Sequence, residues 1–279
     1  MKITILGCGS SMGVPALKYG WGICDPKNPK NRRTRSSIII EDAGTVLLVD
    51  ASPDLREQLL RFDGRNEKLR KNSVQNSYGN LGKNSNENLS PNIDAILFTH
   101  AHFDHTNGIN ELRPLYIKEN KFLDVFATAD TLSELYQNFS YLFQRNSHDI
   151  YDSYLYAHEI FFGKFSIKNI SGICFEQDHG FSKSLGFRIG NFAYCTDVTG
   201  FSDFSVLENL DIWIVDCLNS DEKRPTHANL ELVLSWVEKL NPKKTYLTHM
   251  DTSMDYDSLM NSLPPNVEPA YDMQILYCK

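Results

Sequence analysis

The stretch IDAILFTHAHFDHTNG, residues 93–108, joins an apolar run to a dense group of polar side chains. Its first half suits a buried strand that delivers the chain to a polar turn. His100 and His102 are two residues apart, so an extended backbone points both imidazoles to the same side. Asp104 and His105 follow in the turn. Three imidazoles and one carboxylate so close together predict a metal site suited to Zn, and also to Mn or Fe.

Short apolar runs of the same kind recur along the chain, and most are rich in Val, Ile or Phe. Their length and composition predict buried strands. The runs are residues 3–6, 37–40, 46–49, 95–98, 192–194, 212–215 and 245–247.

Two segments have the apolar spacing of amphipathic helices. The first begins at Ser52, which we expect to cap the helix, with Pro53 at the first helical position. The second spans residues 226–240, whose apolar side chains share one helix face. Strands and helices mixed in this way predict a layered α/β fold, which we assign to one domain, residues 1–279.

The bulk composition is that of a soluble globular protein, with 41% hydrophobic and 23% charged residues. The formal net charge of −7 argues against a partner held by its phosphate backbone, so we do not expect nucleic acid as the main partner. Six cysteines without CxxC spacing are typical of reduced thiols. The short apolar start of the chain suits a strand rather than a signal peptide, and no run is long enough to span a membrane. We expect a cytoplasmic protein.

Two segments differ from the rest of the chain. Residues 63–92 are rich in Asn, Ser, Lys and Gly, and predict a mobile polar insertion. Residues 133–162 are rich in Tyr and Phe, and predict either a helical flap over the active site or a subunit contact in a homodimer. His148 and His158 lie in this aromatic segment without metal-ligand spacing, and we expect them at the surface.

HAHFDH at residues 100–105 resembles the HxHxDH signature of the metallo-β-lactamase superfamily, and this resemblance implies a four-layered αβ/βα sandwich. Later family ligands have counterparts in the same order along the chain: His179, Asp197 and His249. The resemblance implies two divalent metal ions, Zn or Mn, with Fe as a further option. One ion would be held by His100, His102, His179 and Asp197. The other would be held by Asp104, His105, His249 and Asp197.

Two metals that share Asp197 would also share a bridging water. Their charge lowers the pKa of that water far enough to give hydroxide near neutral pH, which attacks phosphorus or a carbonyl carbon. We assign catalytic roles to Asp104 and to His227. His227, at the start of the predicted helix, looks like the non-ligand histidine with which phosphodiesterase members protonate the leaving alkoxide. The other interpretation of His227 is a solvent-facing residue.

Asp50 and Asp216 each follow a predicted strand. Either could accept a hydrogen bond from a ligand histidine and so fix its tautomer. Helix capping or loop bonding is the alternative for both carboxylates.

The segments LGCGSSMGVP (residues 6–15), WGICDP (21–26) and NRRTRSS (31–37) are similar to the phosphodiesterase subgroup that includes the cyclic-phosphate esterase of bacterial phosphonate breakdown. Members of this subgroup can hold an extra zinc on cysteines of the early loop. Only Cys24 stands there, so we do not expect a third metal. We interpret the arginines of the third segment as a solvated basic run, with phosphate contact as the alternative.

The resemblance implies a phosphodiesterase for a small organic phosphate, including a cyclic one, or for a short nucleotide. A lactonase or thioesterase on the same dimetal site remains open. A tRNA 3′-processing-type nuclease is also open, although no Gly-rich arm is evident. A non-catalytic metal-binding interaction protein is the fourth alternative.

Overall fold

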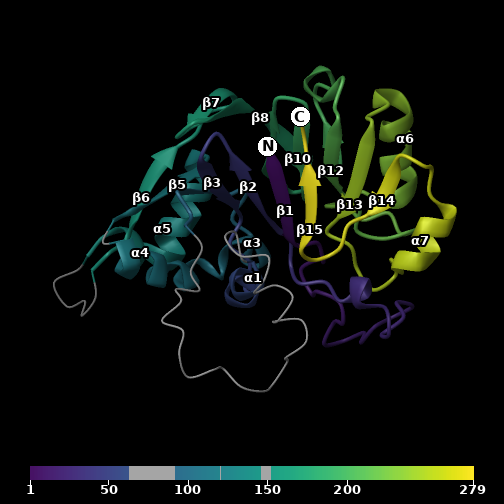
Figure 1. The fold of residues 1–279 in the computed structure, drawn as a ribbon, viewed down its shortest axis with the longest axis horizontal. Helices are drawn as coiled ribbons and strands as arrows, with labels where there is room; N and C mark the ends of the chain where they lie inside the picture. The colour runs from purple at the N-terminus through teal and green to yellow at the C-terminus, as the bar shows by residue number, and fades with distance from the viewer. Residues whose placement is uncertain (63–91, 120, 146–151) are drawn as a thin grey trace.

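Two β-sheets pack against each other in the middle of the molecule, with helices on both outer sides (Figure 1). The computed structural model describes residues 1–62, 92–119, 121–145 and 152–279. The amino and carboxyl ends lie side by side, because the first and last strands pair with each other.

The first sheet has seven strands. In spatial order they are β15 (Gln274–Tyr277), β1 (Lys2–Gly7), β2 (Ser37–Asp42), β3 (Thr45–Val49), β4 (Ala95–Leu97), β5 (Leu123–Ala127) and β6 (Leu155–Glu159). Neighbours from β15 to β3 are antiparallel, whereas those from β3 to β6 are parallel. The carboxyl ends of the parallel strands therefore share one edge of the sheet.

The second sheet is also divided into an antiparallel part and a parallel part. Its order is β11 (Gly200–Phe201), β8 (Ile170–His179), β9 (Ser182–Ile189), β10 (Phe192–Cys195), β12 (Ile212–Asp216), β13 (Lys244–Thr248) and β14 (Val267–Pro269), and β7 (Gly163–Ile167) also pairs with β8. Strands β10, β12, β13 and β14 are parallel. All strands predicted from the sequence are present, most of them longer by one or two residues.

Alternation along each strand divides the apolar residues between two cores. Ile38 and Ile40 point into the core between the sheets, whereas Ile39 points to the opposite face; all three are fully buried. Helices α1 (Leu55–Arg61) and α5 (Ala129–Phe143) cover that opposite face. This pattern follows from the two-residue period of a strand.

Helix α6 (Leu230–Leu240) covers the second sheet, where Val233 and Trp236 are buried. The four layers confirm the predicted αβ/βα sandwich. The shorter helices are α3 (Phe103–Thr106), α4 (Arg113–Glu119) and α7 (Tyr256–Ser262), with 3-10 turns at Pro29–Asn31, Ile109–Leu112 and Ser205–Leu207.

The predicted starts of two helices were wrong. Helix α1 begins at Leu55, because the carboxylate of Asp54 accepts hydrogen bonds from Arg35 and the chain before it forms a turn. Helix α6 begins at Leu230, because the side chain of Asn229 accepts a hydrogen bond from Leu232 N at 3.1 Å and caps the helix there.

Most of the aromatic segment 133–162 belongs to regular elements. Its described residues include most of α5 and all of β6. Tyr154, just before β6, and Leu155 are buried, whereas Phe161 and Phe162 are exposed at the end of the segment. The polar insertion 63–92 lies outside the described residues except for its last residue, and so does His148.

All six cysteines are free and buried. Among the helices that the structure describes, none is both long and apolar enough to cross a membrane.

The prediction of a solvated arginine run was wrong for Arg33, which is only 2% exposed. Its guanidinium donates to Met254 O at 2.6 Å and to Asp251 O at 3.5 Å, and lies 3.9 Å from Cys24 Sγ. The cationic side chain of Arg33 thus connects the loop around Cys24 with the loop that follows β13. No group of potential metal ligands among the described residues includes Cys24.

Replacing Arg33 with methionine is expected to lower the free energy of unfolding by about 2–4 kcal/mol, because buried carbonyl groups lose their donors. Arg32→Met is the matched control, since Arg32 is exposed and its guanidinium lies over the ring of Trp21. Urea denaturation measures both variants. Equal stability of the two would contradict a structural role for the buried guanidinium.

Candidate metal centre

The site residues follow the carboxyl ends of parallel strands in both sheets. Asp50 follows β3, His100 follows β4, Asp197 follows β10 and His249 follows β13. Asp50, Asp197 and His249 have left-handed backbones, with φ of 60°, 52° and 58°. Such a conformation is uncommon for residues with a side chain and is concentrated at functional sites. Strands β3, β10 and β13 therefore each end in a tight turn that directs a polar side chain into the space between the sheets.

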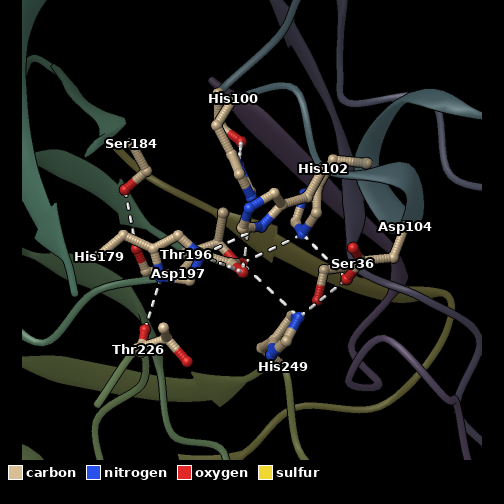
Figure 2. A network of polar contacts seen from close by, with 12 residues as sticks. Ser36, His100, His102, Asp104, His179, Ser184, Thr196, Asp197, Thr226 and His249 are labelled. Atoms are coloured by element: carbon tan, nitrogen blue, oxygen red, sulfur yellow. Dashed lines mark hydrogen bonds and ion pairs between the residues drawn. The ribbon is translucent and has the colours of Figure 1, made fainter. Parts of the chain in front are cut away.

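Figure 2 shows the predicted ligands converging on Asp197. They form two groups, and within each group the potential ligand atoms lie within 4.8 Å of one another. The first group is His100, His102, His179 and Asp197. The second group is Asp104, His105, Asp197 and His249. The structure thus brings together all seven residues that the sequence predicted, in the predicted division.

Asp197 lies between the two groups and presents one carboxylate oxygen to each. Its Oδ2 is 3.6 Å from the Nε2 atoms of both His100 and His179. Its Oδ1 is 3.1 Å from His105 Nε2 and 3.6 Å from His249 Nε2. A carboxylate in this position can bridge two cations.

The donor set fits divalent metal ions. His100 Nε2 is buried and has no hydrogen-bond partner among the described residues, although it points into the first group of ligands. An unpaired buried nitrogen is costly, and a cation would satisfy it. Neutral imidazoles beside carboxylates are the ligands that Zn prefers.

The electrostatics of the centre agree with this fit. Burial, reinforced by neighbouring histidines, holds the pKa of His100 well below its usual value, so its nitrogen keeps a lone pair for a metal. Burial would raise the pKa of Asp197, but the histidines around it, His249 foremost, hold that pKa well below the usual range. For His105, burial acts against the charged form, yet Asp197 and Asp104 raise its pKa well above the usual value. The carboxylates that raise the pKa of His105 are the negative charge that would attract a cation to this position.

A second layer of hydrogen bonds orients the histidines. His105 Nδ1 lies 2.8 Å from Asp50 Oδ2, which confirms the hydrogen bond predicted for Asp50. Thr99 Oγ1 donates to the same carboxylate and lies 3.0 Å from His100 Nδ1. The carbonyl of Thr226 accepts from His179 Nδ1 at 2.5 Å. These contacts leave the opposite nitrogen of each ring facing the centre.

Thr99 and Thr226 were not predicted from the sequence. Thr99 stands directly before His100 at the end of β4, and this position could have indicated its role. Thr226 acts through its backbone carbonyl, for which side-chain chemistry gives no signal. Thr196, directly before Asp197, was also missed; its Oγ1 lies 2.7 Å from Asp197 Oδ1.

Replacing Asp50 with asparagine is expected to weaken metal binding about 10–100-fold, because His105 loses the carboxylate that fixes its tautomer. Competition with a chelator of known affinity measures this change. Asp257→Asn, on the exposed side of α7, is the matched control and should bind metal as the wild type does. Unchanged affinity in Asp50→Asn would show that the hydrogen bond does not support the centre.

His227 lies at the edge of the centre, in the loop before α6 rather than in the helix. Its Nδ1 is 2.9 Å from Asp216 Oδ2, and its Nε2 is 3.9 Å from Asp197 Oδ2. Its ring stacks on His249 at a centroid distance of 4.7 Å. Burial acts against the charged form, but the negative charge of Asp216 outweighs it and raises the pKa of His227 to about 9.

Asp216 therefore holds His227 and not a metal ligand, which corrects the prediction for this carboxylate. Its Oδ1 lies 3.7 Å from His249 Nδ1, too far for a hydrogen bond. Asp216 Oδ2 also accepts from Val198 N at 3.0 Å, so the carboxylate is fixed by the backbone.

A metal-binding site between two sheets of an αβ/βα sandwich defines a class of hydrolases, the metallo-β-lactamase fold. The chain belongs to this superfamily, because the beta-lactamase superfamily domain matches residues 45–250. The fold and the His/Asp groups are those of a hydrolase suited to metal ions.

Solved structures extend the comparison over the full chain. A diphosphatase from the PhnP family is 28% identical, with a TM-score of 0.81, over 100% of this chain and 98% of that one. Zn²⁺-bound PqqB from Methylobacterium extorquens is 17% identical, with a TM-score of 0.69, and each chain is covered to 100%. The short form of human tRNase Z is 16% identical, with a TM-score of 0.64, over 99% of both chains. The last two share the fold.

Among curated proteins, an octanoyltransferase from Porphyromonas gingivalis is 25% identical over 276 residues. The match covers 98% of this chain but 50% of that protein, so this chain spans half the length of its relative.

Proposed function

We propose that the chain is a dimetal phosphodiesterase that hydrolyses a small organic phosphodiester, including a cyclic one. The observation that carries this proposal is the position of Asp197, which presents one oxygen to each of two groups of ligands, with His227 beside it. Zn and Mn suit the donor set, and Fe is also compatible.

The first group, with His100, would hold one ion and the second group, with His105, would hold the other. Bound there, the ions would lower the pKa of a water to near neutral and withdraw charge from the phosphoryl oxygens. The residues around the centre hold the metal ligands in position. Asp50, Thr99 and the Thr226 carbonyl fix the histidine rings, and burial keeps the surroundings poor in bulk water.

His227 would protonate the departing oxygen. Asp216 binds its Nδ1, so the ring faces the centre with Nε2, the atom that would carry the proton. Its side chain is 15% exposed, which leaves it accessible from the solvent side of the centre. An imidazolium at this edge suits an alkoxide leaving group, since an alkoxide is too basic to depart unprotonated.

The likeness to a diphosphatase at 28% identity favours phosphate esters over lactones and thioesters. A lactonase or thioesterase would use the same ligands, but would have less need of the pair His227–Asp216. For a tRNA-processing nuclease, the net charge of −7 is unfavourable.

A titration with metal ions tests the first requirement of the proposal, namely that two bound ions are needed for hydrolysis. Protein stripped with a chelator should bind two Zn or Mn ions per chain and regain hydrolysis of bis-p-nitrophenyl phosphate as the second ion binds. Full activity in the stripped protein would contradict the proposal, and so would binding of two ions without hydrolysis of any phosphodiester.

A further inference from the structure

A cavity of about 680 Å³ opens beside His100 and His102. It lies between the start of α5, the end of the aromatic segment and the start of β9. His100 is 3% exposed, and its unpartnered Nε2 faces the ligand groups at this end of the cavity. The volume is that of a small-molecule site, so a compact group attached to a phosphate at the metal centre would fit.

The lining of this cavity is strongly acidic. It includes the carboxylates of Asp130, Glu134, Glu159 and Glu176, and one cationic side chain, Lys183. Lys183 is 3.3 Å from Glu176 and also pairs with Asp178, so its charge is already compensated.

The other three carboxylates, those of Asp130, Glu134 and Glu159, form no ion pair within the described part of the chain. Among the residues that the structure describes, none supplies a counterion for their negative charge at the cavity. A second anionic group on the substrate would be repelled, and a cationic group would be attracted.

Two aromatic side chains complete the lining. Phe161 and Phe162 are 69% and 49% exposed, and they come directly after the end of β6. Aromatic side chains and carboxylates that line the same cavity are a favourable environment for an ammonium group, which gains from a ring and from the negative charge.

From this geometry we propose that the cavity receives the non-reacting alcohol of the phosphodiester and selects an alcohol that carries a positive charge, such as an amino alcohol. This inference rests on the proposed function and names its substrate class. Glu134 and Glu159 are specificity-determining residues in this account; they do not touch the reacting phosphate.

Three chromogenic phosphodiesters with the same p-nitrophenolate leaving group test the proposal on metal-loaded protein. Their second alcohols are choline (cationic), methanol (neutral) and glycolic acid (anionic). We expect kcat/KM to fall in that order, by about tenfold or more from choline to glycolic acid. The differences in kcat/KM between the three esters should become smaller at about 1 M salt, because the Debye length is then about 3 Å and the charges are screened.

The double variant Glu134→Gln, Glu159→Gln should lose this preference, with a fall in kcat/KM for the choline ester and a rise for the glycolic acid ester. Glu57→Gln, Glu208→Gln is the matched control, because both residues are exposed and neither lines the cavity. Equal kcat/KM of the wild-type protein for the three esters would overturn the proposal. A preference that survives in the double variant would also overturn it.

Calorimetric binding of phosphocholine and of phosphoglycolate to the metal-loaded protein gives a readout that does not depend on turnover. We expect tighter binding of phosphocholine, and loss of the difference in the double variant. If no ester is hydrolysed but this binding preference appears, the proposed function fails and the selectivity of the cavity stands. If neither hydrolysis nor a preference appears, both fail.

Discussion

Replacing Asp197 with asparagine is expected to reduce phosphodiester hydrolysis about a thousandfold or more. The carboxylate presents Oδ2 to His100 and His179, and Oδ1 to His105 and His249. An amide keeps the shape but removes the negative charge and one acceptor, so one of the two groups loses a ligand. Metal content should fall from two ions towards one per chain.

Hydrolysis of bis-p-nitrophenyl phosphate and elemental analysis of the same samples measure this effect. Asp203→Asn is the matched control, since Asp203 is exposed and its carboxylate accepts hydrogen bonds from Ser205. A variant of Asp197 that keeps both ions and wild-type turnover would show that the carboxylate does not join the two groups.

Replacing His227 with glutamine is expected to reduce kcat about 10²–10⁴-fold for phosphodiesters with an alkoxide leaving group. The loss should be much smaller for p-nitrophenyl esters, because p-nitrophenolate departs without a proton. Metal content should stay unchanged, because His227 belongs to neither of the two groups that share Asp197. His158→Gln is the matched control, as His158 pairs with Asp124 away from the centre.

The pH dependence provides a second readout for His227. Its pKa is raised to about 9 by Asp216, and bound cations beside it would lower this value towards neutral. A proton donor works only below its pKa, so kcat for an alkyl ester should fall as pH rises through that value. The falling limb should disappear in His227→Gln. Equal losses for alkyl and p-nitrophenyl esters would contradict proton donation by this residue.

Spacing predicted a metal site at residues 100–105, whereas the resemblance to the HxHxDH signature implied the later ligands His179, Asp197 and His249. His100 and His102 follow β4, and their two-residue spacing predicted imidazoles on the same side of an extended backbone. Asp197 and His249 also follow apolar runs, and the carboxyl ends of parallel strands converge. The sequence therefore contained both the donors and the elements that bring them together.

Other features depend on contacts between distant parts of the chain. The sequence pattern predicted that Arg33 belongs to a solvated basic run. In the structure its guanidinium is bound by the loop at residues 251–254, which lies 218 or more residues further along the chain. The contact of His179 with the Thr226 carbonyl depends on the path of the backbone, and so does the distance from Asp216 to His249. No local pattern encodes these paths.

The most direct test of the account compares three substrates on protein reloaded with Mn or Zn: bis-p-nitrophenyl phosphate, a lactone and a thioester. We expect metal-dependent cleavage of the phosphodiester alone. Cleavage of only the lactone or the thioester would contradict the proposed substrate class, while leaving a dimetal hydrolase.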